Sequence, residues 1–174
     1  MKLKLFIVLL FTLPLFACLE GANEDFTNIS VSDVLVDCQS ASATECTSNN
    51  AGARVYVGWK KGSLSISSCE STLSNIALDF SSYFEAFGSG ITSYEGSPYF
   101  RLTTTISSWQ NSSGAVITLE NTSYTLCGFI DLNNNGYLDS NLNEPVAIQD
   151  NIYPGTIEVT FDNWTDPFLL RRAQ

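Results

Sequence analysis

Histidine is absent from this chain of 174 residues, and methionine occurs once. Without histidine, neither a serine–histidine nor a cysteine–histidine nucleophilic centre can be built. Zinc is also disfavoured, because the five cysteines contain no C-x-x-C pair and no histidine could complete a ligand set. A serine–lysine pair such as Lys61 and Ser63 lacks any supporting motif.

Basic residues are scarce as well. Eight Lys and Arg face eighteen Asp and Glu, which gives a formal net charge of −10. Nucleic-acid backbones and anionic lipid surfaces attract basic proteins, so neither partner is expected.

The first residues have the organisation of an export signal. Lys2 and Lys4 form a short basic region, and residues 5–16 form an apolar run that is too short for a stable membrane span. The run ends at Leu15-Phe16-Ala17-Cys18, which resembles the lipobox of bacterial lipoproteins, although Phe16 replaces the small residue usual there. The alternative is ordinary secretion, which requires small residues at positions −1 and −3, where Leu15 is bulky.

The lipoprotein resemblance implies cleavage before Cys18 and acylation of that cysteine, including palmitate. Leu19 follows Cys18, which by the same resemblance implies the outer membrane of the cell envelope, on its periplasmic or surface face. We therefore predict a signal peptide at 1–17, a lipidated acidic tether at 18–33 and one domain at 34–174. Loss of the signal leaves six basic residues against eighteen acidic ones.

Four cysteines remain after Cys18, and an even number in an exported chain usually forms disulfides. We favour Cys38–Cys46, which closes a short polar loop, and Cys69–Cys127, which joins distant segments. Spacing alone leaves the other pairings open.

Short segments rich in β-branched and aromatic residues, separated by Ser, Gly and Asn, predict a mostly β domain. The predicted strands cover 54–59, 99–109, 115–120, 124–130, 145–148 and 156–161. In the last of these, Ile157, Val159 and Phe161 are expected to face the core. The expected fold is one β-sandwich of immunoglobulin-like or prealbumin-like type. Apolar residues spaced by three and four over 73–87 predict a short helix, or a strand and a loop.

Oxygen-bearing side chains recur at alternate positions directly after the 124–130 strand. Counting from Asp131, Asn133 and Asn135 occupy positions 3 and 5, a glycine occupies position 6, and Asp139 occupies position 9. Glu144 follows at the end of the segment. Carboxylate and amide oxygens in this spacing, with a glycine for the sharp turn, are typical of a calcium loop.

The segment resembles two families of calcium loops over about fifteen residues. One is the EF-hand-like loop of dockerin modules. The other, D-x-N-x-N-G-x-x-D followed by E-P in the β-sandwich B-repeats of bacterial surface adhesins, matches better. The resemblance implies Ca²⁺ held by side chains of Asp131, Asn133, Asn135, Asp139 and Glu144 and by the backbone carbonyl of Tyr137. Leu142 stands where a bidentate glutamate is usual, so Glu144 comes two residues late.

A simpler interpretation of the same residues needs no metal. Asn-Gly between apolar segments, as at Asn135-Gly136, is the strongest short signal for a type I′ hairpin turn. Both interpretations stay open at the level of sequence.

The expected function is that of a lipid-anchored, calcium-stabilised interaction or structural module with a protein or glycan ligand, and not an enzyme. The alternatives are an envelope enzyme of unrecognised type and a carbohydrate-binding module. The second could use an aromatic platform drawn from Trp59, Tyr94, Tyr99, Phe100, Trp109 and Trp164, although such residues more often form the core.

Overall fold

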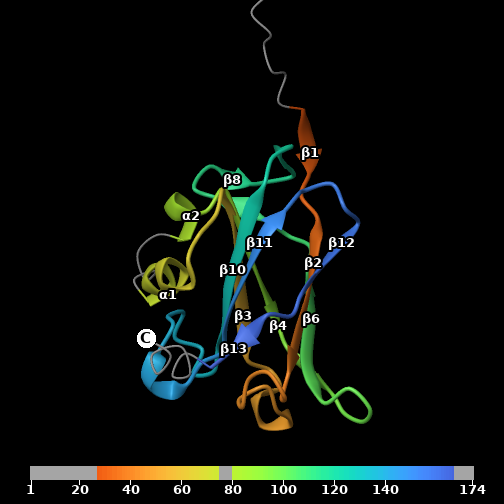
Figure 1. Cartoon of the computed structure of the whole chain (residues 1–174), viewed down its shortest axis with the longest axis vertical. Helices are drawn as coiled ribbons and strands as arrows, with labels where there is room; N and C mark the ends of the chain where they lie inside the picture. Colours follow the sequence, from red (N-terminus) through yellow and green to blue (C-terminus); the bar gives the residue numbers. More distant parts are fainter. Residues whose placement is uncertain (1–26, 75–79, 167–174) are drawn as a thin grey trace, which may run out of the picture.

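The computed structural model describes residues 27–74 and 80–166 of the chain (Figure 1). The strands, in chain order, are β1 (Asn28–Ser30), β2 (Asp33–Gln39), β3 (Arg54–Lys61), β4 (Ala86–Ile91), β5 (Ser93–Glu95), β6 (Arg101–Ile106), β7 (Gln110–Asn111), β8 (Gly114–Ala115), β9 (Thr118–Glu120), β10 (Tyr124–Asp131), β11 (Val146–Ile152), β12 (Glu158–Phe161) and β13 (Trp164–Thr165). The helices are α1 (Ile66–Ser74) and α2 (Phe80–Tyr83), with short 3-10 turns at Ser48–Asn50 and Ser140–Leu142.

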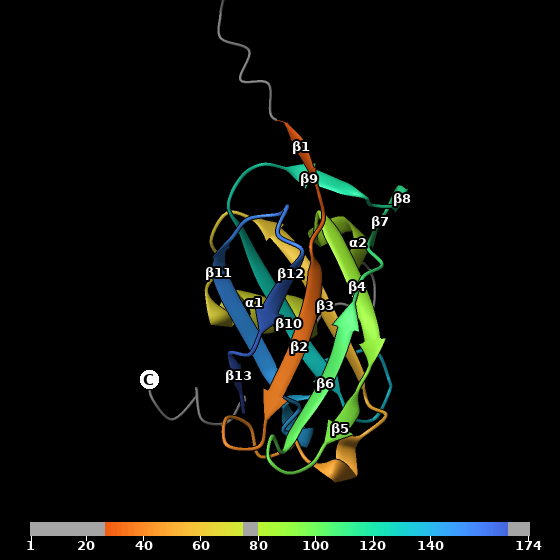
Figure 2. The same ribbon diagram turned by 90° about the vertical axis from the view of Figure 1, so that its right-hand side faces the viewer.

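Two sheets face each other, so the predicted mostly β sandwich with a short helix is confirmed. The larger sheet has seven strands in the order β13-β11-β10-β3-β4-β7-β8, and the smaller has four in the order β12-β2-β6-β5. Figure 2 shows the smaller sheet in front of the larger one, with the pair β1 and β9 at one end. All pairs are antiparallel except β12 with β2.

The main core fills the space between the sheets. Its largest members are aromatic, and Trp59 of β3 makes edge-to-face contacts with Trp109 and Tyr124 at ring-centroid distances of 5.9 Å each. Pairs of this geometry add roughly 0.5–1.5 kcal/mol to the effect of burial alone. These aromatic side chains therefore form the core and are not available as a binding platform.

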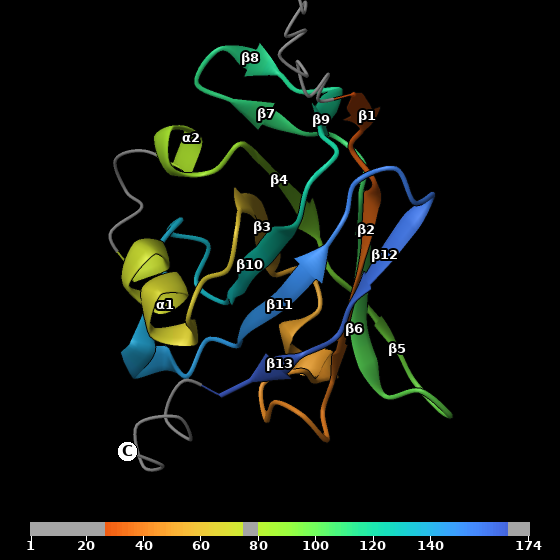
Figure 3. The same cartoon turned by 45° about the horizontal axis from the view of Figure 1, so that its top comes forward.

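The helices cover the outer face of the larger sheet, which gives the molecule three layers (Figure 3). Cys69 and Leu73 of α1 are fully buried against Cys127 and Phe129 of β10. The Cys69–Cys127 disulfide fixes the helix to the sheet, and Cys38–Cys46 closes the turn after β2. Both favoured disulfides are present.

Several expectations at the level of single segments need correction. Strand β2, whose Val34, Val36 and Cys38 alternate into the core, was not predicted, and β1 lies inside the segment assigned to the tether. Helix α1 begins at Ile66, before the apolar spacing that suggested a helix over 73–87. Ile157 was expected to face the core but is 95% exposed, because β12 begins one residue later.

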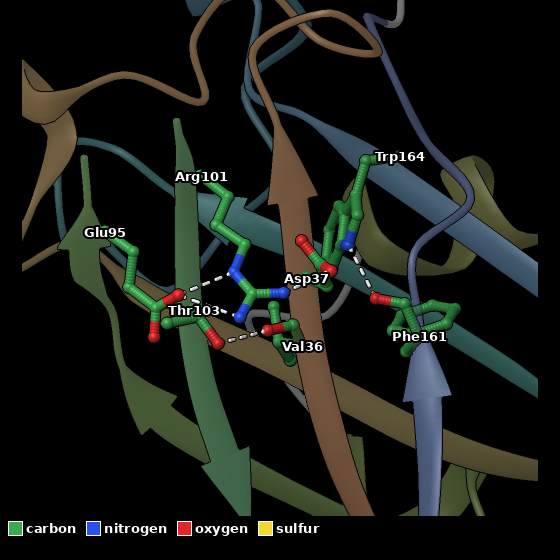
Figure 4. Close-up of polar contacts among 7 residues, drawn as sticks. All are labelled: Val36, Asp37, Glu95, Arg101, Thr103, Phe161 and Trp164. Atoms are coloured by element: carbon green, nitrogen blue, oxygen red, sulfur yellow. Dashed lines mark hydrogen bonds and ion pairs between the residues drawn. The ribbon is translucent and has the colours of Figure 1, made fainter. Parts of the chain in front are cut away.

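The outer face of the smaller sheet is held by a cluster of charges (Figure 4). The guanidinium of Arg101 on β6 donates to Asp37 of β2 at 2.7 Å and to Glu95 of β5 at 2.8 Å. These hydrogen bonds raise the pKa of Arg101 above its ordinary value. One cation thus joins three of the four strands of this sheet.

We expect Arg101→Ala to lower the free energy of unfolding by about 1–3 kcal/mol, because it leaves the nearly buried Asp37 carboxylate without its partner. Lys61→Ala, which removes the exposed pair with Glu120, should cost less than about 1 kcal/mol. Denaturant unfolding of both variants checks this. Equal losses would show that the Arg101 cluster is no stronger than an ordinary surface pair.

The strands run between two opposite ends of the sandwich, which we name by their contents. The tether end contains β1, where the described chain begins, the residues around Ile117 and the 153–157 turn. The loop end contains the 132–145 segment and the 96–100 turn (Figure 1). The register supports this placement, because Tyr124 of β10 pairs with Ile152 at the tether end and Phe129 pairs with Val146 at the loop end.

Candidate metal site

The predicted calcium loop lies at the loop end, between the central strand β10 and its neighbour β11. Asp131 is the last residue of β10 and is fully buried, and Ile130 N–H donates to the Pro145 carbonyl at 2.9 Å to close the base of the loop. The sheet therefore fixes both ends of the segment that carries the predicted ligands.

The Asp131 carboxylate organises the first half of the loop. Its Oδ1 accepts a hydrogen bond from Asn135 N–H at 3.1 Å, and its Oδ2 accepts one from Gly136 N–H at 2.7 Å. Gly136 has a φ of 84°, a conformation that only glycine adopts without strain. The sharp turn expected from the sequence is thus built around the first predicted ligand.

The two asparagines face Asp139. Asn133 Nδ2 and Asn135 Nδ2 both donate to Asp139 Oδ2, at 2.8 and 2.7 Å. Their own Oδ1 atoms accept from the N–H groups of Asn135 and Tyr137. The structure therefore brings positions 3, 5 and 9 of the loop into direct contact.

Glu144 reaches back into the loop despite its late position. Its side chain is fully buried, with Oε1 accepting from Leu132 N–H at 2.9 Å and Oε2 from Asp139 N–H at 2.7 Å. Burial raises the pKa of Glu144, and the nearby carboxylates of Asp131 and Asp139 raise it further against the opposing effect of the two N–H donors. Although Glu144 comes two residues later than the calcium-loop spacing predicts, its carboxylate therefore contacts the backbone on both sides of the loop.

The type I′ turn that the sequence suggests at Asn135-Gly136 does not form. A type I′ turn at Asn135-Gly136 requires positive φ at both residues. The positive φ angles lie instead at Asn134 (57°) and Gly136, and the β10–β11 pairing ends at Phe129 and Val146. The segment is a wide loop that encloses acidic side chains.

In the part of the chain that the structure describes, the loop carboxylates form no ion pair. Among the described residues, no Lys or Arg forms an ion pair with Asp131, Asp139 or Glu144. Within the same ranges, no group of three or more His, Cys, Asp or Glu side chains is arranged to hold a metal on its own. A metal ion in this loop would therefore also need amide or carbonyl oxygens as ligands. The side-chain amide groups of Asn133 and Asn135 would have to give up their hydrogen bonds to Asp139.

Two contacts that the sequence did not predict hold the loop against the rest of the domain. Leu138 is buried in the cluster around α1, and its N–H donates to the Leu73 carbonyl at 3.4 Å. Asn143 Nδ2 donates to Thr44 Oγ1 at 3.1 Å, inside the turn closed by Cys38–Cys46. Leu138 is one of three leucines in this otherwise polar loop, and it was the available signal. Each disulfide thus fixes a segment that touches the loop.

No protein-family model, no curated protein and no solved structure matches the chain. No helix in the described ranges is long and apolar enough to cross a bilayer. Cys18 and the predicted signal peptide lie outside the described residues.

Proposed function

We propose that this chain is an envelope lipoprotein, anchored through Cys18, whose β-sandwich carries a calcium-binding loop and acts as an interaction or structural module. Asp131, Asn133, Asn135, Asp139 and Glu144 would hold the ion, together with the Tyr137 carbonyl. An outer-membrane location follows from Leu19 by resemblance.

The observation that carries the calcium proposal is the state of the three loop carboxylates. Asp131 and Glu144 are fully buried, the carboxylates of Asp131 and Asp139 both raise the pKa of Glu144, and no Lys or Arg among the described residues forms an ion pair with any of the three. Buried charge without a counter-charge is costly. A bound cation would supply that counter-charge, and an oxygen-only donor set favours calcium over zinc or copper.

Calcium here would be structural and weakly held. Three carboxylates and two neutral amides correspond to the extracellular class of sites, with Kd on the order of 10⁻⁴–10⁻³ M. Magnesium is a poorer fit, because it dehydrates reluctantly and prefers a tight octahedron. The ion would join both halves of the loop at the end of β10.

Terbium luminescence tests metal binding at the loop directly. Tyr137, whose N–H donates to Asn135, is close enough to excite a lanthanide that replaces calcium among the predicted ligands. We expect terbium emission on tyrosine excitation, its displacement by calcium and its loss in Asp131→Ala. Equal emission from wild type and Asp131→Ala would place the lanthanide elsewhere and contradict the proposal.

The lipid anchor makes a separate prediction. Cys18→Ser should release the domain into the soluble fraction, or leave an unprocessed precursor in the inner membrane, because the acylated thiol is lost. Fractionation, together with the mass of the N-terminal peptide, measures this. A wild-type protein that is wholly soluble with a free thiol on Cys18 would contradict the anchor.

The enzyme alternative finds little support in the described residues. A cavity of about 330 Å³ is lined by Gly88, Ser89, Ser108, Trp109, Gln110 and Ala115, none of which titrates near neutral pH. The described groups with clearly shifted pKa values lie elsewhere, namely Tyr56, Arg101, Tyr124 and Glu144. An active site should bring such groups into a concave pocket.

The carbohydrate alternative is weakened by burial of the aromatic residues. Trp59, Trp109 and Trp164 are at most 6% exposed, and only Tyr99 and Phe100 of the candidate platform are well exposed. A sugar-binding platform needs accessible aromatic faces. A protein ligand is the better expectation for this module.

A further inference from the structure

The tether end of the sandwich carries the two most exposed large apolar side chains of the described residues, together with an exposed tyrosine. Ile157 is 95% exposed, Ile117 78% and Tyr153 53%. They belong to two separate segments, the residues before β9 and the turn between β11 and β12 (Figures 1 and 2). Isoleucine is among the residues most often buried, and exposed apolar side chains that form one patch mark a contact with another molecule or with a membrane.

Both segments are fixed to the first residues of the domain. Val31 N–H donates to the Ile117 carbonyl at 3.1 Å, and Gly155 N–H donates to the Ser30 carbonyl at 3.0 Å. The hydroxyls of Ser32 and Thr156 are 3.0 Å apart. The apolar side chains are therefore held around the point at which the described chain begins.

The number of residues between Cys18 and β1 limits how far the tether end can lie from a lipid anchor on Cys18. Asn28 lies ten positions after Cys18, and a stretch of that length spans about 35 Å at most when fully extended. The opposite end of the domain lies a further strand length away, about 26 Å for the eight residues of β10. An acyl anchor on Cys18 therefore holds the tether end within about 35 Å of the bilayer and allows it to touch the lipid, while the loop end can lie about 26 Å farther away.

We propose that Ile117, Tyr153 and Ile157 form a membrane-docking surface that inserts into a zwitterionic lipid interface and directs the calcium loop away from the membrane. This inference rests on the proposed lipid anchor. Tethering raises the local concentration of the surface at the bilayer, so that a few apolar side chains suffice. The acidic residues Glu158 and Glu120 border these side chains, which favours uncharged headgroups over anionic ones.

Site-specific fluorescence tests this orientation in the full, lipidated protein reconstituted in phosphatidylcholine vesicles. An environment-sensitive fluorophore is attached at Ile157→Cys, and the matched control is Tyr99→Cys, which is 61% exposed at the loop end. We expect a blue shift and several-fold stronger quenching by nitroxide-labelled lipid at position 157 than at position 99. A label at Tyr153→Cys should be quenched too, and Ile117→Ser with Ile157→Ser should abolish that quenching.

The outcomes separate the docking surface from the anchor. Equal quenching at 157 and 99 in protein that still sediments with vesicles overturns docking and leaves the anchor intact. A blue shift at 157 without nitroxide quenching means that protein covers the surface, which also overturns lipid docking. Protein that stays in the supernatant with a free Cys18 thiol overturns the anchor and the docking surface together.

Discussion

The domain with Cys69→Ala and Cys127→Ala should unfold with a free energy about 4 kcal/mol lower than that of the wild type. The bridge closes a chain segment of 58 residues, and the entropy lost by the unfolded chain grows with that length. In the folded state the bridge also joins α1 to β10, where both cysteines are fully buried. Denaturant unfolding with all other cysteines oxidised measures the loss.

The shorter bridge provides the matched comparison. Cys38–Cys46 spans eight residues, for which the same relation gives about 2.5 kcal/mol. The double alanine variant at Cys38 and Cys46 should therefore be the more stable of the two. If it were the less stable, the turn after β2 would matter more to the fold than the attachment of α1.

Asp131→Ala should have two effects that can be measured separately. In the presence of a chelator, the substitution should lower the free energy of unfolding by about 1–3 kcal/mol, because the N–H groups of Asn135 and Gly136 lose their acceptor. Its charge also raises the pKa of Glu144, so the loss of repulsion offsets part of that cost. In calcium it should additionally lose the whole metal-dependent gain, since no other carboxylate occupies the start of the loop. Thermal melting with and without calcium separates the two effects.

Asp131→Asn and Leu142→Ala are the controls for this variant. The asparagine keeps one of the two acceptor oxygens and removes the charge, so in chelator it should lose less stability than Asp131→Ala, and it should respond weakly to calcium. Leu142 is 46% exposed and provides no side-chain oxygen, so Leu142→Ala should respond as the wild type does. A normal calcium response in both aspartate variants would remove Asp131 from the site.

The sandwich and the loop could be predicted because their signals are local. Alternation in β3 and β10 marks their buried faces, and the oxygen spacing after Asp131 marks the turn that Gly136 completes. The presence of two disulfides was also predictable from the even number of cysteines, although spacing left their pairing open. The strands and the loop depend on residues that are neighbours along the chain, and the disulfides depend on the chemistry of cysteine alone.

The parts that could not be predicted depend on tertiary contacts. Strand β2 was missed because its alternating Val34 and Val36 follow directly on a polar segment, and its partners β6 and β12 are distant in sequence. The return of Glu144 to the backbone of Leu132 depends on how the residues after Asp139 turn, which spacing does not specify. The exposure of Ile157 depends on where pairing with β2 begins.

Thermal melting of the domain in chelator and in calcium tests the central claim most directly. Calcium that binds only the folded state stabilises it by about 2.7 kcal/mol at a concentration a hundredfold above Kd. For a domain of this size we predict a rise in Tm of roughly 5–10 °C. Magnesium at the same concentration should give little change. Melting curves that coincide in chelator and in calcium would contradict a metal site in the 131–144 loop.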